Sequence, residues 1–427
     1  MRRASTTTFA FVSVFVLALS PPLPAEESVR RVNDGNVVLD GVPEIPERIG
    51  EELNRYQNVR GASFQDWAVE GNGLYVTTRF ADTEQIHYVA TPGGARRQLT
   101  FFPEPVSGAD RRPGGAELAF VMDEGGSEFY QIFLLDPLAG DHRRLTDGAS
   151  RNGAAEWSPN GARLAFQSTR RNGRSNDVWL MEVGNPDSAR LVLEAPDGSW
   201  WGPAEWSPSG DHLLVQQYVS VTDSRLHLLD LESGESRRLL GDEEDPNVHL
   251  AETFAPDGRG IYLTTDRESE FIQLAYLDLA SGDLEVLTTG IPWNVDDFAL
   301  SADGRRGAFE VNEGGISRLY LFDPAARTHR AVEGIPVGLL GGLEFSPSGD
   351  RLAMTLNTAR TPSDVFTLAL GDAPLEHGEL VRWTFSEVGG LDTEAFVEPE
   401  LVHYPTFDRV DGEPRRIPAF VYRPPGA

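Results

Sequence analysis

The stretch AEWSPNGARLAFQST, residues 155–169, returns with small changes along most of the chain. Close copies are AEWSPSGDHLLVQQY at 204–218 and LEFSPSGDRLAMTLN at 343–357. Further copies are ETFAPDGRGIYLTTD at 252–266, DFALSADGRRGAFEV at 297–311, ASFQDWAVEGNGLYVTTRF at 62–80 and VSGADRRPGGAELAFVMD at 106–123. Self-similarity of this kind is typical of an array of equivalent structural units.

Each copy carries a glycine that we predict to lie in the same tight turn. Successive turn glycines are 42 to 49 residues apart, and they are Gly73, Gly115, Gly161, Gly210, Gly258, Gly304 and Gly349. A proline that fixes φ and a glycine that accepts positive φ together favour such a turn. Seven units of this length indicate a repeat fold whose units stack on one another.

The sequence of one unit predicts four short antiparallel strands. A strand such as AEW precedes the turn, an alternating apolar strand such as RLAFQST follows it, and DVWLMEV and a basic-then-apolar segment complete the unit. One such sheet cannot bury both of its faces, whereas radial stacking buries them. We therefore predict an all-β fold, a seven-bladed β-propeller over residues 62–388. Two modes of ring closure stay open: the first and last blades meet without a shared strand, or residues 37–39 complete one.

Composition limits the function. The 427 residues include 66 acidic and 37 basic side chains, for a formal net charge of −29, and no cysteine. Because this net negative charge repels nucleic acids and anionic lipid surfaces, we expect neither as a partner. Disulfides and thiolate chemistry are excluded.

The N-terminus has the pattern of a secretory signal. Arg2 and Arg3 precede the apolar run FAFVSVFVLAL at 9–19, and small residues follow up to Ala25. This pattern predicts a signal peptide over residues 1–25, cleaved near Ala25, and a periplasmic or extracellular location. An uncleaved anchor is the rival interpretation, although the run is short for a membrane span. We expect no other membrane contact.

Two segments flank the repeats. Residues 26–61 form an N-terminal segment in which 46–58 is predicted to be a short helix. Residues 389–427 are predicted to be a linker followed by a β-hairpin, because LVHYPTFD and RIPAFVYRP are joined by a polar Asp-Gly turn. A further blade would need four strands, so this hairpin is expected to belong to a different domain.

The repeat resembles the WD40-like repeat of the TolB and prolyl oligopeptidase propellers, whose consensus is roughly W-S-P-D-G-x-x-[IL]-A-F. The flanking segments resemble those of exported S9 serine peptidases, including the opening hairpin of their α/β-hydrolase domain. The resemblance implies a substrate-gating, noncatalytic propeller that acts on peptide substrates through a Ser-Asp-His domain. No G-x-S-x-G and no His-Gly-Gly occurs in the sequence, so no catalytic residue is assigned and this chain alone is expected to be inactive.

An alternative function is a stand-alone periplasmic propeller that binds a protein partner, as TolB does. TolB-type proteins place an α/β domain of more than a hundred residues before six blades. Here only residues 26–61 separate the predicted signal peptide from seven repeats, which favours the peptidase interpretation.

Four residues are weak candidates for substrate binding. Glu243 and Glu244 lie in an acidic run at 242–245, and dipeptidyl peptidases resembling this chain hold a substrate amino terminus with paired glutamates; a solvated acidic turn is the alternative. Trp200 and Trp201 either line a substrate route or pack between blades. The scattered histidines and the lack of HExxH or D-x-D-x-D patterns predict no metal site and no cofactor.

Overall fold

The computed structural model describes residues 29–410, 412–424 and 426, so the predicted signal peptide at 1–25 lies outside the described residues. The chain divides into two compact units, Met1–Asn54 and Arg55–Ala427. The described part of the first unit holds a hairpin of β1 (Arg30–Val32) and β2 (Val37–Leu39) and most of helix α1 (Glu47–Gln57). Within the described ranges, no helix is long and apolar enough to cross a membrane.

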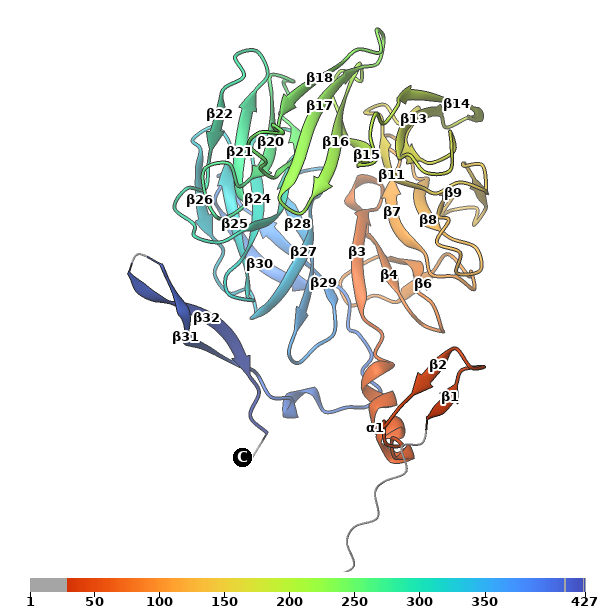
Figure 1. Ribbon diagram of the computed structural model, residues 1–427, viewed down its shortest axis with the longest axis vertical. Coiled ribbons are helices and arrows are strands. Elements are labelled where there is room, and N and C mark those ends of the chain that lie inside the picture. Colours follow the sequence, from red (N-terminus) through yellow and green to blue (C-terminus); the bar gives the residue numbers. More distant parts are fainter. Residues whose placement is uncertain (1–28, 411, 425, 427) are drawn as a thin grey trace, which may run out of the picture. The chain divides into compact units, whose positions relative to one another are not determined.

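The described residues of the second unit form seven four-stranded antiparallel sheets that follow one another along the chain (Figure 1). The first blade holds β3 (Ala62–Trp67), β4 (Leu74–Thr78), β5 (Gln85–Val89) and β6 (Arg96–Gln98), and the second holds β7 (Ser107–Arg111), β8 (Leu118–Met122), β9 (Gln131–Leu135) and β10 (His142–Arg144). The third holds β11 (Asn152–Trp157), β12 (Arg163–Ser168), β13 (Asp177–Glu182) and β14 (Asn185–Leu193), and the fourth holds β15 (Trp200–Trp206), β16 (His212–Ser220), β17 (Asp223–Asp230) and β18 (Ser236–Leu240). The fifth holds β19 (His249–Phe254), β20 (Gly260–Thr265), β21 (Gln273–Asp278) and β22 (Leu284–Val286), and the sixth holds β23 (Val295–Leu300), β24 (Gly307–Asn312), β25 (Ser317–Asp323) and β26 (Thr328–Ala331). The seventh holds β27 (Gly338–Phe345), β28 (Arg351–Thr358), β29 (Asp364–Leu370) and β30 (His377–Arg382). The predicted seven-bladed propeller is confirmed.

The turn between the first and second strands of a blade is the element that the repeated sequence encodes. In the third blade the N–H of Gly161 donates to the carbonyl of Ser158 at 2.7 Å, and φ of Gly161 is +65°. In the first blade the same bond joins Gly71 to Ala68 at 2.8 Å, so Gly71 rather than the predicted Gly73 occupies the turn position. Gly73 was predicted as the turn glycine because two glycines lie two residues apart in this copy. Both have positive φ, and only the hydrogen bond shows which of them lies in the turn.

The apolar core lies between neighbouring blades. Buried side chains from adjacent sheets form one cluster at each contact, as where Tyr262 of the fifth blade packs with Phe298 and Phe322 of the sixth. Every blade thus depends on its neighbours for burial, as expected of radial stacking.

The ring closes without a shared strand. Across the described residues, the first and last blades each take their four strands from their own stretch of sequence, and 37–39 pair with 30–32 instead. The N–H of Ala62 donates to the carbonyl of Ser363 at 2.7 Å, and Trp67 packs in one cluster with Val365 and Trp383. Closure therefore depends on side-chain packing and a few hydrogen bonds.

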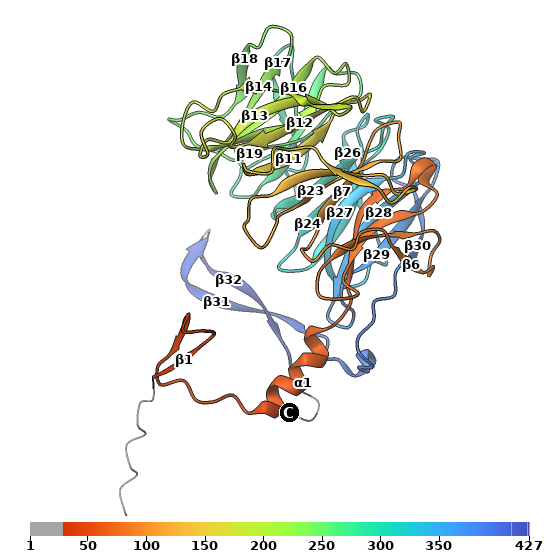
Figure 2. The same cartoon turned by 90° about the vertical axis from the view of Figure 1, so that its right-hand side faces the viewer.

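The predicted C-terminal hairpin is confirmed and comprises β31 (Glu400–Val410) and β32 (Glu413–Val421) (Figure 2). It approaches the turn between β24 and β25, where a Cβ added to Gly315 would lie 2.6 Å from the ring of Phe420. Phe407 and Tyr422 are exposed on it, at 101% and 61%. They lie near opposite ends of the hairpin, Phe407 near its turn and Tyr422 next to the pairing of Glu400 with Val421, so exposed aromatic side chains occur along its length.

Candidate functional site

A set of acidic residues, one from the first strand of each blade, lies along the inner side of the propeller. We call them the axial carboxylates, and they are Asp66, Asp110, Glu156, Glu205, Glu252, Asp297 and Glu344. First strands of neighbouring blades contact each other at most of the blade junctions. The carboxylates therefore approach one another although they are far apart in sequence.

A β-bulge places each of these side chains. All seven first strands shift register against the second strand next to the acidic residue, for example between Gly153 and Glu156 in the third blade and between Ala251 and Thr253 around Glu252 in the fifth. A bulge redirects side chains away from the regular alternation of a strand. The bulge accordingly allows an acidic residue within a strand whose other positions pack in the core.

Burial dominates the electrostatics of the axial carboxylates. The side chain of Asp110 is exposed, but surrounding protein atoms displace water from around it and, with a smaller contribution from Asp66, raise its pKa to about 7. Burial likewise raises the pKa of Glu205 to about 7 and that of Glu252 to about 8, in the latter case against a hydrogen bond from Thr264. Burial and then the charges of Glu205 and Asp110 hold the pKa of Glu156 well above its usual range. Like charges in a poorly solvated place disfavour joint ionisation.

The most tightly connected part of the set lies at the closure of the ring. The carboxyl group of Asp66 in the first blade interacts electrostatically with that of Glu344 in the last blade, and Oδ2 of Asp66 accepts a hydrogen bond from the N–H of Arg111 at 2.5 Å. Burial raises the pKa of Asp66 to about 6 despite Arg111, and burial followed by Asp66 raises that of Glu344. Joint ionisation of these two neighbouring carboxyl groups is therefore disfavoured.

The axial carboxylates can hold protons or attract cationic groups at neutral pH. No group of three or more metal-ligating side chains occurs among the described residues. The set was not predicted from the sequence, although every repeat copy carries an acid in its first strand. The signal was hidden because the spacing between the acid and the aromatic residue before the turn varies, so that Glu252 precedes Phe254 by two residues and Glu156 precedes Trp157 by one.

Trp200 and Trp201 begin the first strand of the fourth blade. Trp201 is 5% exposed, its Nε1 donates to Oδ1 of Asp197 at 3.0 Å, and its ring centroid lies 4.7 Å from that of His227. Trp200 pairs across the sheet with Tyr218 and covers Gly202, where an added Cβ would meet its ring at 2.3 Å. Trp201 is thus a packing residue in this structure, and Trp200 is half-buried.

Glu243 and Glu244 follow the last strand of the fourth blade. The carboxylate of Glu243 accepts from Nη1 of Arg225 at 3.1 Å, and Arg225 also pairs with Asp223 at 2.9 Å. The N–H of Glu244 donates to the side chain of Asp242 at 3.0 Å. The structure therefore does not present the two glutamates as a matched pair, since one of them is engaged by a buried arginine.

A serine, an aspartate and a histidine meet at the turn of the fourth blade, but they do not form a catalytic triad. The hydroxyls of Ser207 and Ser209 donate to Asp211, at 2.9 Å for Ser207. Nδ1 of His212 lies 2.8 Å from the same carboxylate. Hydroxyl and imidazole thus share one acceptor, whereas activation of a serine requires the hydroxyl to donate to the imidazole.

Comparison with known proteins agrees with this fold. The family described as prolyl oligopeptidase, N-terminal beta-propeller domain, matches residues 106–376, more than half of the chain. Curated relatives include the uncharacterized peptidase YuxL of Bacillus subtilis, 26% identical over 204 residues, and the uncharacterized protein Atu1656 of Agrobacterium fabrum, 25% identical over 138 residues. These matches cover 47% and 31% of this chain, and 28% and 45% of the respective relatives.

Solved structures show the same fold over most of the chain. A prolyl endopeptidase from a study of inter-domain dynamics superposes with a TM-score of 0.72 at 12% identity, covering 89% of this chain and 57% of the endopeptidase. Prolyl oligopeptidase B from Galerina marginata, bound to a 35mer substrate, gives a TM-score of 0.69 at 14% identity, covering 88% and 56%. The chain spans little more than half the length of these peptidases and less than half that of the curated relatives. On its repeat sequence, its seven blades and the match over residues 106–376, the chain belongs to the prolyl oligopeptidase N-terminal β-propeller family.

Proposed function

We propose that this chain is the substrate-gating, noncatalytic propeller portion of a secreted S9-family serine peptidase, in which peptide hydrolysis is carried by a Ser-Asp-His domain outside these 427 residues. The observation that carries the proposal is the family match over residues 106–376 of a seven-bladed ring. The hairpin β31–β32, with its exposed Phe407 and Tyr422, supports it as a surface on which such a domain would pack.

A ring of this kind gates by exclusion. Placed over a hydrolase site, it admits short or unfolded peptides and excludes folded proteins. A folded protein would first have to unfold, and its free energy of unfolding is typically about 5–15 kcal/mol. Those axial carboxylates that are ionised would add a preference for peptides with positive charge, because ionised carboxylates produce a negative potential.

The test uses the protein in which this propeller is joined to its hydrolase domain. The expected result is efficient cleavage of short proline-containing peptides and of an unfolded protein, with at least about a hundredfold slower cleavage of the same protein when folded. Equal rates on the folded and unfolded forms would contradict gating. Turnover of a chromogenic proline-containing peptide by the pure 427-residue chain would contradict its noncatalytic role.

A further inference from the structure

Arginine side chains link neighbouring blades at a recurring position. Nη2 of Arg163 donates to the carbonyl of the turn glycine Gly210 in the next blade at 2.7 Å, and Nη2 of Arg351 donates to that of Gly71 at 3.1 Å. Each guanidinium also lies over a tryptophan of the next blade, 4.9 Å from the ring of Trp206 and 4.7 Å from that of Trp67. Two junctions thus hold a guanidinium in a slot between blades, whereas Arg306, at the same position in the sixth blade, donates to the carbonyls of Gly371 and Asp372.

Other junctions fill the slot differently. Nε of Arg112 donates to the carbonyl of Gly161 at 2.7 Å. In the first and fifth blades a glycine, Gly73 or Gly260, stands at the position of Arg163, and a tyrosine of the third strand occupies the space next to it. A Cβ added to Gly73 would lie 2.6 Å from the ring of Tyr88, and a Cβ added to Gly260 would lie 2.3 Å from the ring of Tyr276.

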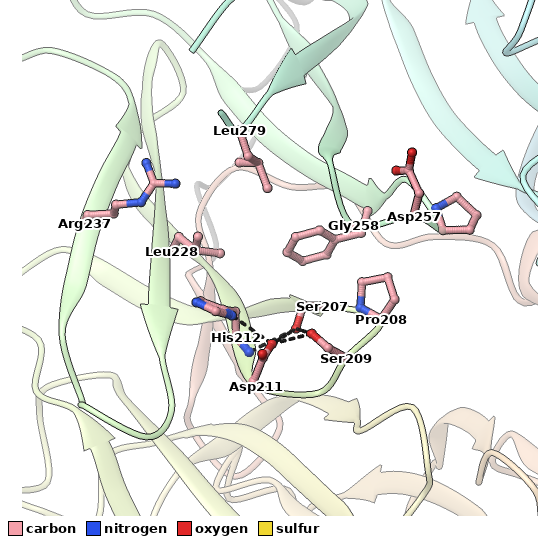
Figure 3. Close-up of a pocket in the computed structure, with 12 residues that line it drawn as sticks. Ser207, Pro208, Ser209, Asp211, His212, Leu228, Arg237, Asp257, Gly258 and Leu279 are labelled. Carbon is pink, nitrogen blue, oxygen red and sulfur yellow. Dashed lines mark hydrogen bonds and ion pairs between the residues drawn. The ribbon is translucent and has the colours of Figure 1, made fainter. Parts of the chain in front are cut away.

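The junction between the fourth and fifth blades has neither an arginine nor a tyrosine at these positions. The position of Arg163 is occupied by His212, and the position of Tyr276, two residues before the last aspartate of the third strand, is occupied by Leu228. His212 is held within its own blade, with Nδ1 2.8 Å from Asp211 and Nε2 3.7 Å from Asp230. A pocket of about 360 Å³ remains at this junction (Figure 3).

The lining of the pocket matches the filled slots. Phe254, which is 5% exposed, stands where Trp206 and Trp67 stand at other junctions, and Gly258 is the turn glycine. The carboxylates of Asp211 and Asp257 lie beside the apolar lining, and hydrogen bonds from Ser209 and His212 hold the pKa of Asp211 well below its usual range. Arg237, the one arginine in the lining, lies on the opposite side from Asp257 and Gly258 (Figure 3).

We propose that this pocket, the junction pocket, binds the guanidinium of an arginine side chain presented by a peptide. A planar, delocalised cation can stack on Phe254 and donate to the Gly258 carbonyl, as Arg163 and Arg351 do at their own junctions, and Asp257 adds a carboxylate acceptor. The pocket lies beside the turns between first and second strands, whereas the hairpin β31–β32 approaches a turn between second and third strands. The inference therefore goes beyond the proposed gating function and does not depend on it.

The ligand arm of the test is saturation-transfer NMR on the full chain with N-acetyl-arginine amide. The expected result is saturable binding with a Kd on the order of millimolar, and binding at least about tenfold weaker for the lysine and citrulline analogues. Citrulline keeps the shape and loses the charge, while lysine keeps the charge and loses the planar fork. The absence of saturable binding, or equal binding of all three amides, would overturn the proposal.

The protein arm fills the pocket from within. His212→Arg should restore the link seen at Gly210 and Gly71, and Leu228→Tyr should reproduce the tyrosine filling; each is expected to weaken binding at least about tenfold without lowering the unfolding midpoint. His377→Arg, which replaces a histidine by arginine in the fourth strand of the seventh blade and away from the pocket, is the control and should bind as the parent does. Full binding by either folded pocket variant would overturn the proposal, and the ligand arm decides if neither variant folds.

Discussion

Nε1 of Trp67 donates a hydrogen bond to the backbone carbonyl of Glu344, 3.2 Å away and 277 residues distant in the sequence. The same bond joins Trp157 to the carbonyl of Asp110 at 3.2 Å and Trp206 to that of Glu156 at 3.0 Å. Each tryptophan thus bonds to the main chain of an axial carboxylate in the preceding blade. The junction that closes the ring therefore uses the bond found at internal junctions.

Trp67→Phe should destabilise the fold by about 2–4 kcal/mol, because Trp67 is fully buried and its loss leaves a cavity and an unpaired carbonyl. Trp206→Phe, at an internal junction, is the matched control and should cost a similar amount. The measurement is urea unfolding of both variants. A negligible effect of Trp67→Phe beside a large effect of Trp206→Phe would show that the closing junction does not contribute as the structure indicates.

A disulfide across the same junction should stabilise the ring. A Cβ built on Gly61 lies 3.7 Å from Cβ of Ser363, which matches disulfide geometry, and the chain has no other cysteine. Gly61→Cys with Ser363→Cys should raise the free energy of unfolding by about 2–4 kcal/mol when oxidised. Comparison of oxidised and reduced protein gives the effect, and the single variants are controls. An oxidised protein no more stable than the reduced one would contradict the predicted closure.

The axial carboxylates predict that stability falls as pH rises. Their folded pKa values are raised, to about 7 for Asp110 and Glu205 and about 8 for Glu252, so at these three groups the folded state binds more protons than the unfolded state between pH 4 and 8. Stability is accordingly fully present below the ordinary carboxyl pKa and is lost through this window. The unfolding temperature should drop by a few degrees or more between pH 7 and 8.5, above the range in which His227 and His249, whose pKa values burial lowers to about 4, act in the opposite direction.

Glu252→Gln should flatten that pH dependence, because a neutral amide replaces a group that resists ionisation next to Asp297. Glu232→Gln, at an exposed turn of the fourth blade, is the control and should leave the dependence unchanged. Thermal unfolding at several pH values measures both. A steep dependence that persists in Glu252→Gln at full size would contradict the assignment.

Glu243→Gln should change stability by less than about 1 kcal/mol, because the carboxylate is 74% exposed and Arg225 keeps its pairing with Asp223. Chemical denaturation checks this value. A loss above 2 kcal/mol would show that the Glu243–Arg225 pair is a structural element of the fourth blade.

The fold was predictable because its signal is local and repeated. Ser207, Pro208 and Gly210 encode a turn by their own conformational preferences, and every copy of the phrase adds the same information. Ring closure was not predictable, because the atoms that make it, such as the Glu344 carbonyl and the Ala62 N–H, are backbone groups that every residue has.

The axial carboxylates and the junction pocket were harder to predict from the sequence, because both depend on contacts between blades. The axial carboxylates lie at bulges that each shift the register by one residue, but Glu252 is itself unpaired within its bulge whereas Glu156 is the first paired residue after its bulge. The junction pocket exists because His212 and Leu228 are smaller than the arginine and tyrosine found elsewhere. That difference has meaning only once the contact of Arg163 with Gly210 is known.

The most direct test of the account is to read the coding sequence past the codon for Ala427. The account predicts a reading frame that continues into a His-Gly-Gly stretch and a G-x-S-x-G serine turn, followed by the aspartate and histidine of a hydrolase domain. A stop codon with no such frame encoded nearby would contradict the account and favour a propeller that binds a protein partner.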